Sequence, residues 1–132
     1  MAEHPNVALV RRAMQAMNEM DMSKADEEMA IVEAFMADDI VWHEIGRAEP
    51  RRGKDELRAA MFDFPSDTKF HYELHDVLAN DEHAIAMGTA TVTRGDESIE
   101  YRTAEIFHIR DGKATERWAF SDDTAAIEAF FA

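Results

Sequence analysis

The stretch IEYRTAEIFHIRDGKATERWAF, Ile99 to Phe120, decides the fold. Residues 99–109 alternate with the period of two that is typical of a β-strand. Asp111-Gly112 then supplies the residue pair that tight hairpin turns favour, and Lys113 to Phe120 follows as another strand. The stretch therefore predicts two long antiparallel strands joined by a short turn.

Two more strands precede this hairpin. The segment from Ala84 to Thr93 is rich in small and β-branched residues, which favour strands. Before it, Phe70, Tyr72 and Leu74 alternate with polar residues in the same period of two. Turns are expected at residues 80–81 and 94–96. Four consecutive strands linked in this way predict an antiparallel sheet.

The first half of the chain has the period of a helix. Apolar residues recur at helical spacing in the first segment: Val7, Val10, Met14 and Met17. A second helix is expected to begin at Ser23 and to end at Asp38-Asp39. The remaining expected elements are a strand over 40–42, a loop over 46–53, a short helix over 54–61 and a last helix capped by Asp122 or Asp123.

This order predicts an α+β fold with one domain over residues 1–132. Helices that come before an antiparallel sheet must bury their apolar sides against one of its faces. If the sheet is strongly curved, the result is a cone wrapped around the N-terminal helices. We expect a central cavity between the helices and the sheet, mostly apolar with a few polar groups.

Composition narrows the classes of function. The 132 residues include 28 acidic and 14 basic side chains, for a formal net charge of −14. Such a charge argues against binding to nucleic acid or to anionic membrane surfaces, because both would repel the protein. The chain has no cysteine, and we see neither a signal peptide nor a membrane span, so we expect a cytoplasmic protein.

Four segments resemble the nuclear transport factor two-like superfamily and, within it, the SnoaL-like proteins with their cystatin-like α+β domain. They are ADDIVWHEIG (37–46), GKDELRAAM (53–61), LHDVLANDEHAIA (74–86) and FHIRDGKATERWAF (107–120). The resemblance implies a cone with a ligand cavity, and a homodimer formed through the outer face of the sheet. It does not imply one activity, because the superfamily includes isomerases, cyclases, hydrolases, dehydratases and non-catalytic binders.

Two enzymes of this superfamily suggest site residues. Ketosteroid isomerase has an aspartate base at the end of the first strand, and this position falls on His43. Its oxyanion-hole aspartate matches Glu105, two residues before Phe107, but the tyrosine of its first helix falls near Ala13. The resemblance to limonene epoxide hydrolase puts Thr103 where that enzyme has its arginine. It puts Ala119 where that enzyme has its second aspartate.

His43 and Glu105 are the predicted catalytic residues. Imidazole has the ordinary pKa closest to neutrality, so His43 is suited to move a proton, although a histidine that simply bonds a nearby carboxylate is an equal alternative. Glu105 is expected to face the cavity, where it could pair with His43 or donate a hydrogen bond while protonated. The alternative for Glu105 is a salt bridge to Arg102 or Arg117.

Several further residues are predicted to bind the ligand. Strand alternation places Tyr101, Thr103 and Phe107 on the same face as Glu105. The other predicted ligand-binding residues are Ala119, Met14, Met17 and Met61. Thioether side chains are adaptable and suit either a pocket or a core, and the sequence leaves both open for the three methionines.

Other patterns give weaker indications. His71, Glu73 and His75 have the residue types of a metal site, but strand residues four apart lie about 13 Å from each other, so we predict no metal. The basic cluster of Arg47, Arg51 and Arg52 is expected to pair with surface carboxylates. No nucleotide fingerprint is present, so we expect no nucleotide or flavin cofactor.

Two functions remain open at this stage. The favoured one is a cofactor-independent acid–base enzyme, of the isomerase, cyclase, dehydratase or hydrolase type, acting on a small and largely apolar molecule. The alternative is a binding protein of the same fold that holds a hydrophobic metabolite without chemistry. A structural dimer with a collapsed cavity is a third reading.

Overall fold

The computed structural model describes residues 3–18, 25–61 and 67–132, with the side chains of all of these except 25–29 and 61. Two helices come first, α1 (Pro5–Asn18) and α2 (Ala25–Phe35). They are followed by β1 (Met36–Trp42), β2 (Arg51–Arg52) and α3 (Lys54–Met61). The second half contains β3 (Thr68–Ala79), β4 (His83–Arg94), β5 (Glu97–Arg110), β6 (Lys113–Ser121) and α4 (Thr124–Phe131).

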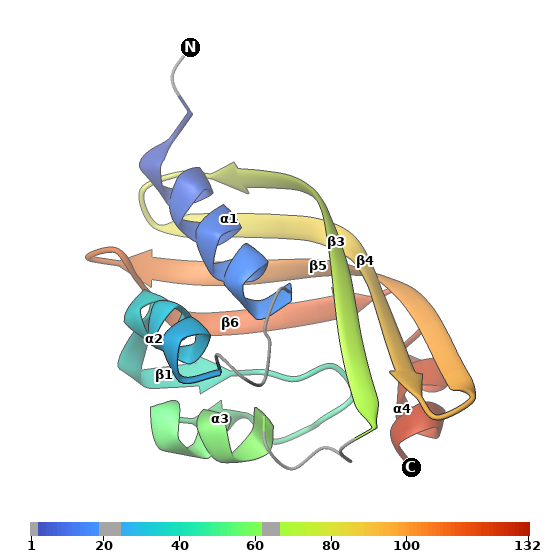
Figure 1. Ribbon diagram of the computed structural model, residues 1–132. Helices are drawn as coiled ribbons and strands as arrows, with labels where there is room; N and C mark the ends of the chain where they lie inside the picture. Colours follow the sequence, from blue (N-terminus) through green and yellow to red (C-terminus); the bar gives the residue numbers. More distant parts are fainter. Residues whose placement is uncertain (1–2, 19–24, 62–66) are drawn as a thin grey trace.

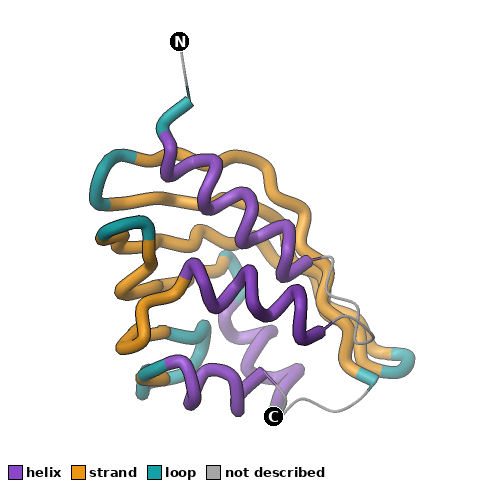
Figure 2. The backbone as a smooth tube through the Cα atoms, turned by 60° about the vertical axis from the view of Figure 1, so that its left-hand side comes forward, coloured by secondary structure: helices purple, strands orange, loops and turns teal. Residues whose placement is uncertain are grey.

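The strands form one six-stranded mixed sheet in the order β2-β1-β6-β5-β4-β3. All neighbours are antiparallel except β1 and β6, which run parallel. Figures 1 and 2 show a strongly bent sheet, with α1, α2 and α3 on one of its faces. The expected α+β fold with a curved sheet is therefore confirmed.

Turn chemistry and bulges produce this hairpin array. Asp111 (φ 52°) and Gly112 (φ 76°) both have the left-handed backbone that the tightest hairpin turns require. The register shifts between Leu74 and Asp76 in β3, and between His108 and Ile109 in β5. Such irregularities bend a strand and increase its twist, which helps the sheet to curl around the helices.

The core lies between the helices and the inner face of the sheet. Val10, Val32, Ile40 and Phe107 are at most 1% exposed. From β4 the inner face receives small side chains, with Ala84, Ala86 and Ala90 all buried. Small residues on this strand let α1 approach the sheet closely.

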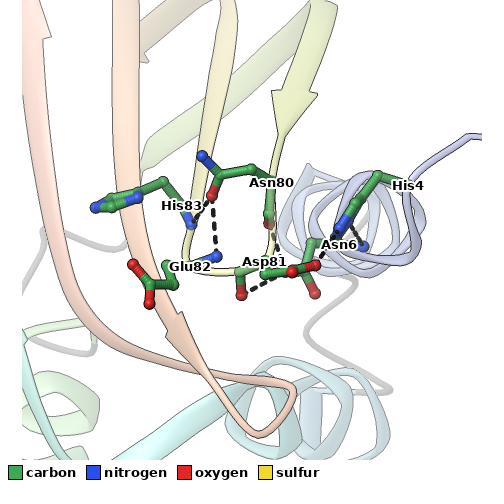
Figure 3. Close-up of polar contacts among 6 residues, drawn as sticks. All are labelled: His4, Asn6, Asn80, Asp81, Glu82 and His83. Carbon is green, nitrogen blue, oxygen red and sulfur yellow. Dashed lines mark hydrogen bonds and ion pairs between the residues drawn. The ribbon is translucent and has the colours of Figure 1, made fainter.

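Polar contacts fix the start of α1 to the β3–β4 turn, as Figure 3 shows. His4 Nε2 lies 2.8 Å from the Asp81 carboxylate, and Asn6 Nδ2 donates to the carbonyl oxygen of Asn80 at 2.9 Å. The Asn80 side chain in turn accepts hydrogen bonds from the backbone N–H groups of Glu82 and His83. These bonds hold the first helix against a turn that is more than 70 residues away in the sequence.

Two expected boundaries are wrong. The second helix ends at Phe35 rather than at Asp38-Asp39, and the following strand begins at Met36 rather than at Ile40. Met36 is buried and pairs with Ala114 of β6, so tertiary pairing extends the strand through the acidic residues. Arg51-Arg52, expected in a loop, pairs with Trp42 and Val41 as a two-residue strand.

Other expectations for the ends of helices have mixed outcomes. Asp123 is the N-cap of α4, and its carboxylate accepts a hydrogen bond from Ala126 N, as predicted. The predicted cap at Ser23 lies outside the described residues. None of the described helices is long and apolar enough to cross a membrane.

Candidate functional site

A buried ion pair lies on the inner face of the sheet, among apolar core residues. Glu105 of β5 is 6% exposed and Arg117 of β6 is 9% exposed. Arg117 Nε donates to Glu105 Oε1 at 3.1 Å, and Arg117 Nη2 donates to the same oxygen. The β5–β6 register pairs Phe107 with Arg117 and Glu105 with Ala119, so the two charged residues are diagonal neighbours on one face.

Arg117 has further contacts that fix its position. Its guanidinium carbon lies 4.1 Å from the centroid of the Trp42 ring, a cation–π contact. Its Nη1 donates to the carbonyl oxygen of His43 at 3.0 Å. Contacts with β1 and β5 therefore hold this side chain in one orientation.

Tyr72 brings a phenol to the same region from β3. Its hydroxyl lies 3.1 Å from Thr103 Oγ1. Burial, followed by the Glu105 carboxylate, raises the pKa of Tyr72 from 10.0 to about 12. The same two causes raise the pKa of Tyr101. Both phenols therefore stay protonated at neutral pH, and both can donate a hydrogen bond.

A pocket of about 270 Å³ opens between α1 and β3, next to Tyr72. It has one predicted ligand-binding residue, Met14, in its wall. The lining side chains are Arg11, Met14, Gln15, Asn18, Tyr72 and Leu74. Its volume is just below the range of roughly 300–1,000 Å³ that is usual for ligand pockets, so it suits a small molecule.

The other predicted ligand-binding residues have several locations. Tyr101 and Thr103 lie on the inner face with Glu105, as strand alternation predicted, and Ala119 is the cross-strand partner of Glu105. Phe107 is 1% exposed and packs edge-on against Phe35. Met17 packs against the hydrophobic core. The side chain of Met61 lies outside the described part of the chain.

His43 and Glu105 do not converge, so the expected pairing across a cavity is wrong. His43 Nε2 lies 2.7 Å from Glu116 Oε2, and its ring stacks on Trp118 with centroids 5.3 Å apart and planes 4° apart. Trp42 pairs with Arg117 on the inner face, so the next residue, His43, points to the outer face. Each residue contacts the partner type that its alternative reading named: His43 bonds the Glu116 carboxylate, and Glu105 forms an ion pair with Arg117.

The ring of His43 belongs to a row of rings on the outer face. His108 lies edge-on to Trp118 at 4.6 Å, and His83 lies edge-on to His108 at the same distance. His108 and Trp118 are partly buried. Their face of the sheet is the one opposite to α1, α2 and α3 (Figure 1). These rings extend across β6, β5 and β4 from the end of β1.

Two weaker sequence indications concern a metal site and the basic cluster of Arg47, Arg51 and Arg52. Among the described residues, no group of three or more histidine, aspartate or glutamate side chains could hold a metal ion. In the basic cluster, Arg51 forms an ion pair with Glu44 at 2.6 Å, and Arg47 donates to the carbonyl oxygen of Glu49. These arginines therefore bind neighbouring groups of their own loop.

Sequence reasoning missed Tyr72 as a site residue and considered Arg117 only as a structural partner. Strand alternation did place Tyr72 on one face with Phe70 and Leu74. Its nearness to Thr103 and Glu105 depends on the order β5-β4-β3, in which the Tyr72 ring must reach across β4. The alternation of residues within one strand does not indicate which residues of another strand lie close to Tyr72.

Comparison with solved structures identifies the same fold in other proteins. A protein of Burkholderia pseudomallei, described as nuclear transport factor two-like and of unknown function, has a TM-score of 0.79 at 20% identity, with 98% of this chain and 100% of that chain covered. TerC, co-crystallised with polyporic acid, has a TM-score of 0.78 at 17% identity, with 98% and 100% covered. An epoxide hydrolase from M. tuberculosis, described as similar to LEH, has a TM-score of 0.71 at 18% identity, with 96% and 92% covered.

The comparison with curated proteins gives no match. The SnoaL-like domain family matches residues 10–117, which extend from α1 to the site arginine on β6. The matched segment includes His43, Tyr72, Glu105 and Arg117. The chain therefore belongs to the SnoaL-like domain family, and it shares its fold with the nuclear transport factor two-like protein of Burkholderia pseudomallei.

Proposed function

We propose that this protein is a cofactor-independent acid–base enzyme that acts on a small, largely apolar carbonyl compound bound between α1 and the inner face of the sheet. The observation that carries the proposal is the buried Glu105–Arg117 pair with the half-buried Tyr72 beside it. A buried ion pair adds little net stability compared with apolar residues of similar size. Ionisable groups retained among core side chains are typical of functional sites.

Each member of this group has a distinct role in the proposal. The Glu105 carboxylate accepts a proton from the carbon next to the carbonyl, which breaks the C–H bond and leaves an enolate. The Tyr72 hydroxyl donates a hydrogen bond to the enolate oxygen, where negative charge develops. Arg117 orients Glu105 and balances its charge. In a substrate with a β,γ carbon–carbon double bond, transfer of the proton from Glu105 to the far carbon of the dienolate completes an isomerisation. Alternatively, the enolate carbon attacks a second carbonyl of the same molecule, and the alkoxide that forms takes the proton from Glu105, which gives a cyclisation.

The shape and lining of the pocket support a small ligand with one polar end. Met14 and Leu74 offer apolar contact, while Arg11, Gln15, Asn18 and Tyr72 add polar side chains to the wall. Among the structural neighbours, one is described as an epoxide hydrolase and another was crystallised with polyporic acid. These descriptions concern those proteins, and they support only the broad class of small-molecule chemistry for this chain.

Deuterium exchange tests the proposal directly. We expect the protein to catalyse deuterium uptake next to the carbonyl group of 2-tetralone in heavy water at neutral pH, followed by NMR. Glu105→Gln should lower the rate about 10²–10⁴-fold, the usual effect of removing a general base. Glu116→Gln is the matched control, because Glu116 is a partly buried carboxylate on the opposite face, bound to His43. Equal rates in wild type and Glu105→Gln would remove Glu105 from the mechanism.

A non-catalytic binding protein is the second candidate. It is favoured by the two hydrogen bonds from Arg117 to a single Glu105 oxygen, since they occupy an oxygen that would otherwise be open to a substrate. In that case 2-tetralone should raise the melting temperature without exchanging its protons. Glu105→Gln would then change affinity alone.

A further inference from the structure

Gly88 of β4 lies on the inner face of the sheet, between residues that have a side chain. Its inward-facing neighbours Ala86 and Ala90 are both buried. Gly88 pairs with Leu74 on one side and with Thr103 on the other. Its φ is not in the left-handed region where four other glycines of the chain lie, so the backbone conformation does not require a glycine here.

The reason for a glycine lies in the space above it. A Cβ atom built on Gly88 would lie 2.5 Å from Tyr72 Cζ and 2.6 Å from Tyr72 Oη. It would also lie 2.5 Å from the backbone oxygen of Glu73. The outer end of the Tyr72 ring therefore occupies the volume that any other residue would fill at this position.

In this arrangement the Tyr72 side chain extends over β4, so its hydroxyl reaches β5. Tyr72 belongs to β3, yet its hydroxyl bonds Thr103 on β5, and β4 lies between these two strands. Without the gap at Gly88, the outer end of the ring could not lie over β4, and its hydroxyl would move away from Thr103 and Glu105.

We propose that Gly88 is a positioning residue of the site, whose missing side chain sets the place of the Tyr72 hydroxyl beside Thr103 and Glu105. The proposal rests on the proposed function for its effect on catalysis, but not for its effect on Tyr72. The ligand that this geometry fits carries a carbonyl or enolate oxygen at its buried end, since Tyr72 offers a hydrogen-bond donor there.

Alkaline titration of Tyr72 tests the positioning itself. The chain has two tyrosines, so a Tyr101→Phe background leaves Tyr72 as the sole phenol that contributes to absorbance at 295 nm. In that background Gly88→Ala should lower the pKa of Tyr72 from about 12 towards 10.0, because the hydroxyl leaves its buried place beside Glu105. Thr103→Val should not lower it, since the hydrogen bond to Thr103 itself lowers this pKa. Circular dichroism at each pH verifies that the protein is folded.

Each result of the Gly88→Ala experiment either supports or overturns the proposal. A folded Gly88→Ala protein with an unchanged Tyr72 titration would overturn the proposal and leave Gly88 a purely structural role. If Gly88→Ala does not fold, the double variant Tyr72→Ala/Gly88→Ala decides. A folded double variant shows that the Tyr72 ring requires the glycine, whereas an unfolded one assigns the requirement to the Glu73 backbone and overturns the proposal.

Catalysis gives an independent readout. Gly88→Ala should lower the exchange of 2-tetralone about a hundredfold, the usual cost of losing one preorganised hydrogen-bond donor, and Tyr72→Phe should do the same. If the wild type exchanges no protons while the titration behaves as expected, the proposed function fails and the positioning of Tyr72 stands. Exchange by Gly88→Ala at the wild-type rate, with a shifted titration, would overturn the catalytic part of the inference.

Discussion

At the scale of single residues, Tyr72 and the Glu105–Arg117 pair distinguish this inner face from an ordinary core. Each of these groups is polar, and Glu105 and Arg117 are buried among apolar core residues. The chain satisfies them with partners from β1, β5 and β6. Their energetics lead to two predictions.

Replacement of Tyr72 should alter the dependence of stability on alkaline pH. Because burial and then Glu105 raise the pKa of Tyr72 to about 12, the folded protein keeps a proton that the unfolded chain releases near pH 10.0. The stabilisation is complete below pH 10.0 and is lost as the pH rises to about 12. Urea unfolding between these pH values should show a shallower decline for Tyr72→Phe than for wild type. Parallel declines would contradict the raised pKa.

Replacement of Arg117 should be costly. Arg117→Met leaves the Glu105 carboxylate buried without its partner, which typically costs about 3–5 kcal/mol of unfolding free energy. The double variant Glu105→Leu/Arg117→Met should recover most of this loss. Arg102→Met is the control: Arg102 pairs with Asp122 on the surface and is 75% exposed, so its loss should cost less than about 1 kcal/mol by urea denaturation. Equal losses of unfolding free energy in Arg117→Met and Arg102→Met would contradict the prediction that the partner of a buried carboxylate matters more than a surface arginine.

At the scale of elements, the end of β1 separates the two groups of ionisable side chains. Trp42 contacts Arg117 on the inner face, while His43 contacts Glu116 and Trp118 on the outer face. These three partners are consecutive residues of β6, so the parallel pairing of β1 with β6 assigns the contacts of Trp42 to one face and those of His43 to the other. A shift of one residue in this register would exchange the two faces.

The last helix offers a prediction at this scale. Asp123 caps α4, and Arg94 Nη2 donates to the carbonyl oxygen of Phe130 near the other end of this helix. Asp123→Ala should destabilise the protein by about 1 kcal/mol, because the N–H of Ala126 loses its acceptor. Asp123→Asn keeps a capping oxygen and should cost much less in thermal unfolding. A loss of the same size in both variants would argue against capping as the cause.

At the scale of the whole molecule, the outer face of the sheet is the largest feature without a role in the inner-face site. The residues at the centre of this face alternate along their strands with core residues of the inner face. They are Ile85, Met87, Ile106 and Trp118, and all four are partly buried. Leu78 and Phe120, 55% and 57% exposed, lie on the same face. Apolar and aromatic side chains of this kind at the centre of a face, with charged residues around them, are typical of interfaces.

We propose that a second copy of the chain covers this face. Light scattering should then give twice the chain mass of 15.0 kDa. Phe120→Glu should yield monomers, because a buried carboxylate without a partner opposes association. Ile31→Glu on α2, where the wild-type side chain is 37% exposed, is the control and should leave the dimer intact. A wild-type monomer at high protein concentration and moderate salt would contradict the proposal.

The sequence by itself determined the order of the helices and long strands, the hairpins and the residues that share a face with Glu105. These properties depend on local physics: a period of two along each strand, a period of 3.6 along each helix, and turn residues with left-handed backbone at Asp111 and Gly112. The same alternation implies opposite faces for Trp42 and His43, as observed. It did not indicate which of the two pointed inward, because alternation gives two faces without saying which is covered.

Only the tertiary structure decided which groups meet. The partner of Glu105, the outward direction of His43 and the reach of Tyr72 over Gly88 depend on strand order, register and the start of β1 at Met36. Each of these joins residues that are distant in the sequence, and the free energy that selects them comes from packing the whole core. A one-residue change of register would leave the local patterns intact and would bring a different set of side chains together.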